Sequence, residues 1–480
     1  MPTVDLTISL VDIYLAALAV VVLGVDLVAP RAWRKEKALL TAGGLLLGLV
    51  VVGLLWGEQP VLAFHRAYVL DHLALFFKAL FILGGALVVA LSYDHFRDLV
   101  PGFGEYFFLL VVIVLGCSLL ASANDLILVW VAFEMISLSS YVLAGYLRFD
   151  RRSNEAGLKY FLYGAAASAV MVYGMSWLYG LGRSTNLSDM AGSLATGAPA
   201  GVLALALMLV GLGYKIAMAP FQSWVPDVYE GAPTPVTAFL SVVPKAAGFA
   251  FLLRLLGPVG SLLLPHWPVM LAVLATLTMF AGNLMALPQT NIKRMLAYSS
   301  VAHAGYLLIG VVVYTQNALN LGALLYYLLA YLVMNLGAFA VVILIERNTG
   351  RQLISDYAGL ARTDLGLALI MTLFLLSLVG IPPTAGFLGK LLVFGAALRT
   401  PPWGWLAIVG IINAAISVYY YMNVAREMFF GRGPARALTV RPGPVVLVIA
   451  LLAGAVVVLG LFPPSGLLNA ARMSGFIWGG

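Results

Sequence analysis

The chain has 480 residues, of which 62% are hydrophobic and only 10% are charged, and its net charge is +7. A soluble protein of this length needs far more charge to cover its surface, so the composition excludes a water-soluble enzyme and indicates an integral membrane protein. The single cysteine, Cys117, cannot form an internal disulfide, ligate an iron–sulfur cluster or complete a zinc site, and the five histidines are scattered. We therefore expect no cofactor, no metal and no nucleic-acid partner, and we interpret the positive charge as a topology signal.

Long apolar segments follow one another along the whole chain. The first, near 7–29, is too long for a signal-peptide core and follows an acidic rather than a basic start, so it should stay in the mature protein. Because a spanning helix needs about 20 apolar residues, the sequence predicts an all-α polytopic membrane protein with about 14 transmembrane helices. The spans lie near residues 7–29, 38–56, 70–92, 105–122, 124–147, 154–182, 200–221, 235–256, 264–287, 293–314, 319–346, 364–397, 405–428 and 443–463.

Two of these spans contain prolines where a helix interior is expected. The seventh reads GLGYKIAMAPFQSWVP, with Lys215 shortly before Pro220, and the twelfth reads SLVGIPPTAGFLGKLLVF, with Pro382 and Pro383 shortly before Lys390. Proline removes a backbone donor and clashes with the preceding turn, so both helices should be broken near mid-membrane. Irregular backbone at that depth survives only where it is buried in protein or lines a hydrated cavity. Matched breaks in two halves indicate an ion site in an inverted-repeat transporter.

The two breaks divide the chain into units. Spans four to eight and nine to thirteen form two five-helix repeats, and because five is odd, consecutive repeats would insert with opposite topology. We expect an N-terminal three-helix segment at 1–104, a first repeat at 105–256 with its broken helix near 215–226, a second repeat at 257–430 with its broken helix near 380–390, and a C-terminal helix at 431–480.

Basic residues gather in the loops that follow odd-numbered spans, among them Arg151, Arg152 and Arg347. The opposite loops hold few, and we place Arg66 and Arg254 there. Positive charge marks the cytoplasmic side of a membrane protein. This pattern predicts a multi-pass protein of a prokaryotic cell (inner) membrane, with both termini outside.

Five lysines fall inside predicted spans, namely Lys78, Lys159, Lys215, Lys245 and Lys390. A charge at the centre of a spanning helix costs about 2.5–3.5 kcal/mol, so such residues are usually paired and functional. Lysine also loses its proton readily when desolvated, whereas arginine does not. Two of the five have a plainer interpretation: Lys159 can snorkel toward the basic loop before it, and Lys78 has no polar stripe around it and is interpreted as structural.

Glu134 lies near the middle of the fifth span and is the only acid far from a predicted membrane interface. Ser137 and Tyr141 follow on the same face, so this helix has a polar stripe that cannot face lipid. The alternative is a neutral carboxyl that locks two helices together. His303, in the tenth span with Ser299 one turn before it, is either a hydrogen-bonded helix contact or a proton relay. Together with the lysines, we interpret it as a relay.

Three segments resemble the signature of subunit N of the membrane arm of respiratory complex I, within the antiporter-like superfamily. They read PFQSWVPDVYEGAPTPVTAFLSVVPKAAGF, TNIKRMLAYSSVAHAGYLL and GIPPTAGFLGKLLVF, and the similarity covers essentially the whole chain. The resemblance implies a proton-translocating subunit of NADH-quinone oxidoreductase. It implies that Glu134 and Lys215 form a paired charge, that Lys245 is the central connecting lysine and that Lys390 lies near the outer exit.

The resemblance also implies that Lys159 and His303 lie along the polar axis between the half-channels. One position departs from the family, because many members carry histidine where this chain has Gln222, and glutamine cannot carry a proton's charge. NADH, FMN, iron–sulfur clusters and quinone would belong to partner subunits, alongside antiporter-like siblings and small membrane subunits. Three alternatives stay open: a subunit of a multi-subunit sodium–proton antiporter, a stand-alone secondary transporter, and a non-pumping scaffold subunit.

Overall fold

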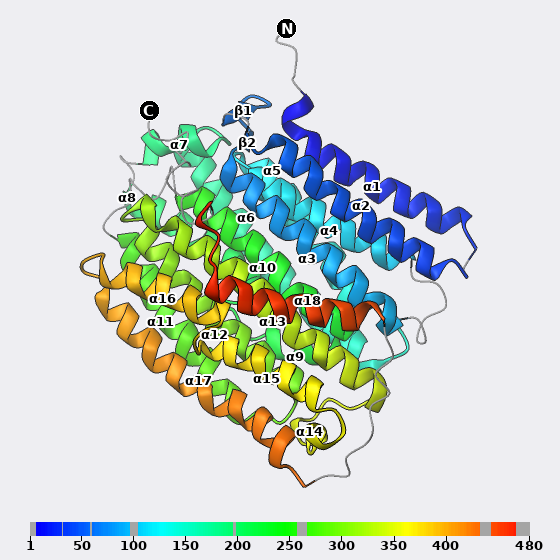
Figure 1. Cartoon of the computed structure of the whole chain (residues 1–480). Coiled ribbons are helices and arrows are strands. Elements are labelled where there is room, and N and C mark those ends of the chain that lie inside the picture. Colours follow the sequence, from blue (N-terminus) through cyan, green and yellow to red (C-terminus); the bar gives the residue numbers. More distant parts are fainter. Residues whose placement is uncertain are drawn as a thin grey trace.

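The structure is a computed structural model that describes residues 6–30, 32–57, 60–96, 104–194, 198–256, 266–432 and 443–466. Within these residues, 13 helices are long and apolar enough to cross a membrane (Figure 1). Two shorter apolar helices, α15 (Leu365–Val379) and α16 (Ala385–Leu398), together occupy the predicted twelfth span. The predicted all-α polytopic membrane fold is confirmed.

The long helices follow the predicted spans closely. Their bounds are α1 Leu10–Val28, α2 Arg34–Leu55, α3 His72–Phe96, α4 Gly104–Ser122, α5 Leu126–Ala144, α6 Arg151–Gly182, α8 Ala198–Ile216, α10 Thr234–Leu256, α11 His266–Ala286, α12 Ile292–Tyr314, α13 Leu321–Thr349, α17 Gly404–Phe430 and α18 Pro444–Leu461. Short helical segments connect them: η1 Leu6–Ser9, α7 Leu187–Leu194, α9 Val225–Gly231, η3 Ala318–Asn320, η4 Ile354–Tyr357 and α14 Leu360–Thr363.

Side-chain caps determine where several helices begin. Asp125 accepts from the Ile127 backbone N–H at 2.8 Å at the start of α5, and Asn291 accepts from the Lys293 N–H at 2.8 Å at the start of α12. Asp150 caps α6 in the same way. Each cap satisfies a backbone donor that has no partner within its own helix. Each of these caps lies within four residues of the predicted start of its span.

A small hairpin was not predicted. Strands β1 (Val61–Ala63) and β2 (Tyr68–Leu70) pair antiparallel, and Phe64, His65 and Arg66 between them adopt positive φ angles. The predicted third span began at residue 70, whereas α3 begins at His72 after the hairpin. The hairpin is too short to be told from a loop by pattern alone. It places the Tyr68 side chain against α1 and α4.

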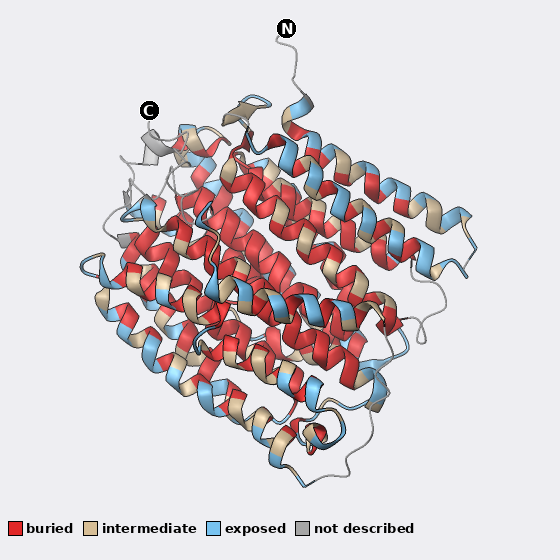
Figure 2. Ribbon diagram, in the orientation of Figure 1, coloured by how far each residue is buried: buried red, intermediate tan, exposed pale blue. Residues whose placement is uncertain are grey.

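Burial divides the helices into a central group and a lipid-facing rim (Figure 2). In the apolar 18-residue stretch of α10, 100% of the residues are buried, and in those of α12 and α13 the share is 94% each. Most residues in the apolar stretches of α1, α2 and α18 are not buried, and these helices present leucine and valine side chains outward. Since a bilayer favours apolar surface on the outside, polar residues on α10 and α12 can be stabilised only by other parts of the protein.

Both proline-containing spans are interrupted where the prolines lie. The α8 helix ends at Ile216 and α9 begins at Val225, while α15 ends at Val379 and α16 begins at Ala385. In the second break, Gly380 adopts a φ of +91°, which a residue with a side chain rarely does. A Cβ atom on Gly386 would lie 1.8 Å from the Ser377 carbonyl oxygen, so only glycine lets α16 approach α15 this closely. The inverted relation between the two five-helix units stays a prediction.

Candidate functional site

Lys215 and Glu134 lie near one another but hold different partners. Lys215, in the last turn of α8, is buried, and its Nζ donates to Ser137 Oγ on α5 at 2.7 Å. The same Nζ lies 4.3 Å from the centre of the Phe133 ring. Glu134 accepts from Ser168 Oγ on α6 at 2.8 Å. Among the described residues no ion pair joins the two charges, so the predicted pairing stays a prediction, with Ser137 as the hydroxyl that holds the ammonium.

Gln222 lies in the break between α8 and α9 and is half-buried. Its Oε1 atom is buried and has no hydrogen-bond partner among the described residues. Buried polar atoms are normally satisfied by protein or by ordered water. Gln222 therefore offers an acceptor to water beside the first break, although it cannot carry the charge of a proton.

Lys245 lies near the middle of α10. Its Nζ donates to Ser300 Oγ on α12 at 2.5 Å and lies 5.5 Å from the centre of the Tyr229 ring on α9. Gly248 follows one turn later on α10, and a Cβ there would meet Lys215 Cγ at 3.4 Å. The crossing of α8 and α10 thus brings the first two predicted lysines into neighbouring turns.

His303 is buried on α12, one turn after Ser300. Its Nδ1 is hydrogen-bonded to the Tyr327 hydroxyl on α13 at 2.7 Å, and its Nε2 lies 3.4 Å from the Tyr421 hydroxyl on α17. The Tyr331 ring stacks on the imidazole at a centroid distance of 5.1 Å. A ring with a hydroxyl at both nitrogens can accept a proton on one and donate from the other, which is the geometry a relay needs.

Lys390 is buried on α16 and reaches back across the second break. Its Nζ donates to the carbonyl oxygens of Leu378 at 2.9 Å and Val379 at 2.7 Å. These are the last carbonyls of α15, which a lysine satisfies while also complementing the negative end of the helix dipole. The Tyr306 ring of α12 lies 4.7 Å from the same Nζ. The break and the lysine are therefore one structural unit.

Lys159 lies in a different environment. It pairs with Glu155 at 2.8 Å and with Asp227 of α9 at 2.7 Å, and its side chain is 36% exposed. Arg294 joins the same network by pairing with Asp227 at 2.8 Å and with Glu230 at 2.8 Å. Burial opposes ionisation of Asp227, but its ion pairs with Lys159 and Arg294 outweigh burial and hold the pKa below its ordinary value. Lys159 thus lies in a partly exposed network, apart from the buried lysines, and its relay role stays a prediction.

Lys78, which was interpreted as structural because no polar stripe surrounds it in its own span, has polar partners on two other helices. Lys78 Nζ donates to both carboxylate oxygens of Asp12 on α1, each at 2.8 Å, and to Ser118 Oγ on α4 at 2.8 Å. Asp12 also accepts from Ser118 and from the Tyr68 hydroxyl. Asp12 is thus a second acid inside a predicted span, and it lies in the first turn of α1. The signal was an aspartate inside the first apolar run, where a buried charge needs a partner.

The count of loop charges also needs correction. Arg254, placed in a loop from the sequence, is buried at the end of α10 and forms a two-pronged contact with Asp71, at 2.6 and 2.5 Å. Lys37 is buried against Asp26 at 2.6 Å. Arg31, Arg97, Arg436, Arg441 and Arg472 lie outside the described residues. Some basic residues near helix ends therefore form buried ion pairs with acids of other segments. Such residues do not indicate which side of the membrane a loop faces.

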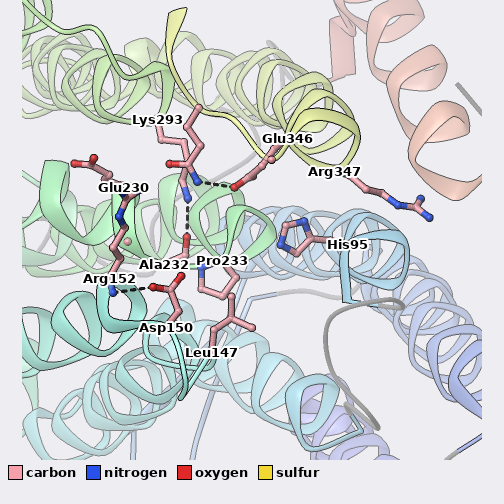
Figure 3. A pocket seen from close by; sticks show the side chains of 13 residues that line it. His95, Leu147, Asp150, Arg152, Glu230, Ala232, Pro233, Lys293, Glu346 and Arg347 are labelled. Carbon is pink, nitrogen blue, oxygen red and sulfur yellow. Dashed lines mark hydrogen bonds between the residues drawn. The ribbon is translucent and has the colours of Figure 1, made fainter. Parts of the chain in front are cut away.

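A cavity of about 360 Å³ lies where the loops after several odd-numbered spans converge (Figure 3). In Figure 3 the Lys293 Nζ donates to the Ala232 carbonyl oxygen, at 2.7 Å, and Glu346 and His95 face the same space. The cavity is lined by His95, Leu147, Asp150, Arg152, Glu230, Gly231, Ala232, Pro233, Lys293, Glu346, Arg347, Gly350 and Gln352. No sequence pattern indicated it, because its walls come from segments far apart in the chain. In the part of the chain that the structure describes, no group of three or more His, Cys, Asp or Glu is placed to hold a metal ion.

Comparison with known proteins gives consistent relatives. Residues 123–417 match the family described as NADH:quinone oxidoreductase/Mrp antiporter, TM. The chain is 41% identical to NADH-quinone oxidoreductase subunit N of Chlorobium chlorochromatii, over 98% of this chain and 94% of that protein. It is 45% identical to subunit N of Anaeromyxobacter sp., over 84% of this chain and 83% of that protein.

Solved structures of membrane complexes contain chains with the same fold over nearly the whole length of this chain. A chain of respiratory complex I from Thermus thermophilus superposes with a TM-score of 0.80 at 38% identity, covering 95% of this chain and 98% of that chain. A chain of the Mrp complex from Dietzia sp. gives a TM-score of 0.85 at 20% identity, covering 99% of this chain and 98% of that one. At that identity the second likeness concerns the fold alone.

Proposed function

The chain belongs to the family of NADH-quinone oxidoreductase subunit N, and we propose that it moves protons through a row of buried side chains, Glu134, Lys215, Lys245, His303 and Lys390. As a member of this family it is a proton-translocating membrane subunit of an enzyme complex, and its partners are other membrane-arm subunits of complex I. In this proposal the electron transfer from NADH to quinone, with FMN and iron–sulfur clusters, takes place in partner subunits, and this chain supplies only the proton pathway.

The observation that carries the proposal is the placement of α12 between two lysines. Ser300 accepts from Lys245 at one end, His303 follows one turn later, and the Tyr306 ring lies under Lys390 at the next turn. Buried polar groups in series on one helix face give a proton successive acceptors across the protein. Lys215, whose side chain packs beside the α10 turn after Lys245, extends this row toward Glu134.

Glu134 is the proposed gate. In the structure Lys215 is held by Ser137, while Glu134 is held by Ser168. If Glu134 moves onto Lys215, the ammonium gains a contact worth about 4 kcal/mol at an effective dielectric of about 20. Moving one charge against 100 mV costs about 2.3 kcal/mol. Forming and breaking this single contact is therefore enough to hold a proton and then release it.

The proposed setting is a prokaryotic cell (inner) membrane. The basic loops after odd-numbered spans would face the cytoplasm, and both termini would lie outside. Two inverted five-helix repeats would then place the first break, beside Lys215, and the second, beside Lys390, at related depths. This arrangement is what the matched positions of the two interrupted helices support.

The test uses Lys215→Ala and Glu134→Ala in the assembled enzyme. We expect each to abolish proton pumping, or turnover with it, because each removes one half of the gate. Proton uptake by membrane vesicles is measured during NADH oxidation, with Arg66→Ala, which removes an exposed ion pair to Asp189, as the control. Full coupled pumping in either variant would refute the proposal.

The same vesicles separate the remaining alternatives. A sodium–proton antiporter subunit would show sodium-dependent proton exchange without NADH. A stand-alone transporter would exchange ions as a purified chain in liposomes, whereas a complex I subunit should do little without partners. A scaffold would tolerate neutral substitutions of Lys215 and Lys390 with unchanged proton stoichiometry and would show only an assembly defect.

A further inference from the structure

The cavity of Figure 3 contains buried groups that the proposed row does not use. His95 is buried at the end of α3, and its Nδ1 has no hydrogen-bond partner among the described residues. Glu346, near the end of α13, accepts from Gln352 Nε2 at 2.5 Å and from the Thr234 hydroxyl. A cavity of about 360 Å³ lined by these groups is large and polar enough to hold several waters.

A polar stripe leads from this cavity to the middle of α10. Thr234, which contacts Glu346, is the first residue of α10, and Thr237, Ser241 and Lys245 follow at helical spacing on the same face. Thr237 donates to the Tyr229 carbonyl at 3.0 Å, and Ser241 accepts from Asn335 Nδ2 at 2.6 Å. Few other polar side chains interrupt this helix, which is buried along its whole length.

Unsatisfied polar atoms lie beside the stripe. Asn335 Oδ1 and the hydroxyls of Tyr229 and Tyr331 are buried without a hydrogen-bond partner among the described residues. Tyr229 faces Lys245, and Asn335 contacts Ser241. A small cavity lined by Lys245, Ser300 and Tyr331 completes the series. Since such atoms are rarely left unpaired in folded proteins, water along this face is their natural partner.

We propose that the cavity is the proton-uptake site of the chain, that Glu346 and His95 accept protons there, and that protons then reach Lys245 along the Thr234, Thr237 and Ser241 face of α10. This proposal rests on the proposed function and specifies the route by which protons enter the row. The stripe enters the proposed row at Lys245, whose Nζ donates to Ser300, while the neighbouring Lys215 Nζ donates to Ser137 on α5.

The transfer balances in simple steps. A proton from cytoplasmic water binds the Glu346 carboxylate, with the neutral His95 imidazole as the second acceptor on the cavity wall. The carboxylic acid passes its proton to water held by the threonine and serine hydroxyls, and the carboxylate is regenerated. The uncharged amine of Lys245 accepts the proton and becomes an ammonium. Each hydroxyl gives and takes one proton, so the stripe is unchanged after each passage.

The first experiment measures water access along α10 in the assembled enzyme. Single Thr237→Cys and Ser241→Cys changes are made in a Cys117→Ala background, and vesicles exposing the basic loops are treated with a small water-soluble methanethiosulfonate. Val243→Cys is the matched control, because Val243 faces Gly84 of α3 in the packed core. We expect both stripe positions to react about tenfold faster than the control, since thiol reaction requires water access. Equal reaction at Ser241→Cys and Val243→Cys would overturn the proposal.

The second experiment measures NADH-linked proton uptake. We expect Glu346→Gln to slow it by about 100-fold, the usual loss when a positioned proton-transfer group is removed, and Glu346→Asp to keep most of it. Asp189→Asn, an exposed acid far from the cavity, is the control. Normal pumping by Glu346→Gln, in an enzyme where Lys215→Ala abolishes pumping, would overturn the uptake path alone. Normal pumping by both variants would overturn the proposed function as well.

Discussion

The Asp12–Lys78 pair gives the most direct test of which buried lysines transport protons and which hold helices together. Lys78 is 0% exposed, and its ammonium contacts both Asp12 oxygens, Ser118 Oγ and the Ser118 carbonyl. These contacts join α1, α3 and α4. We expect the pair to be structural, because its hydrogen-bond partners among the described residues, Ser118 and Tyr68, lie outside the proposed proton row.

The expected magnitude follows from the geometry. Lys78→Met leaves the Asp12 carboxylate buried without a cation, which costs about 3–5 kcal/mol, or about two to three and a half powers of ten in the folded-to-unfolded ratio. Adding Asp12→Asn removes the uncompensated charge and keeps an oxygen that accepts from Tyr68 and Ser118. The double variant should therefore recover most of the loss, with a coupling free energy of about 2 kcal/mol or more.

The assay is thermal release of the chain from the purified enzyme, followed on native gels, with proton uptake per NADH measured on the intact fraction. Lys78→Met should release at lower temperature, and Asp12→Asn/Lys78→Met should release near the native temperature with normal uptake. Equal stability of the single and double variants would refute the role of charge pairing. A stable double variant that no longer pumps would place Lys78 in the proton row.

Three further outcomes follow from other contacts. Lys390→Arg should keep the contact with the end of α15 and allow assembly yet stop proton transport, because arginine does not release its proton; vesicle pumping and native gels check both parts. Gly386→Ala should sharply lower the yield of assembled enzyme, since its Cβ would lie 1.8 Å from the Ser377 carbonyl, whereas Gly395→Ala, with nothing within 4 Å, should assemble normally. The ion pairs that lower the pKa of Asp227 stabilise the fold above its ordinary value of 3.8, and this contribution is lost as the pH falls below it. Asp227→Asn should therefore be less stable than the native chain near neutral pH, and thermal release should show the difference narrowing in acid.

Local signals explain what could be predicted. A membrane span is recognised from about 20 consecutive apolar residues, so the length of the apolar runs located the helices. Pro220 and Pro383 located the two interruptions, because proline breaks a helix locally. Lysines inside those stretches identified the buried row.

Long-range pairing explains what could not be predicted. Asp12, Lys78 and Ser118 come from three helices, and only tertiary packing shows that they meet. Arg254 near a span end resembles a loop charge until Asp71 is placed opposite it. The contact of Lys215 with Ser137 rather than Glu134 depends on side-chain orientations that no pattern encodes. The cavity has walls from five separate stretches of the chain, so a single sequence gives no sign of it.

The contact of Lys390 with the end of α15 has a mechanical consequence. Two carbonyls that a continuous helix would have bonded internally depend instead on an ammonium carried by the next helix. When that ammonium gives up its proton, the hydrogen bonds lose the assistance of the charge and the helix end loses its counter-ion. The protonation state of Lys390 and the rigidity of the junction between α15 and α16 therefore change together. The junction is rigid when Lys390 carries a proton and more flexible when it does not.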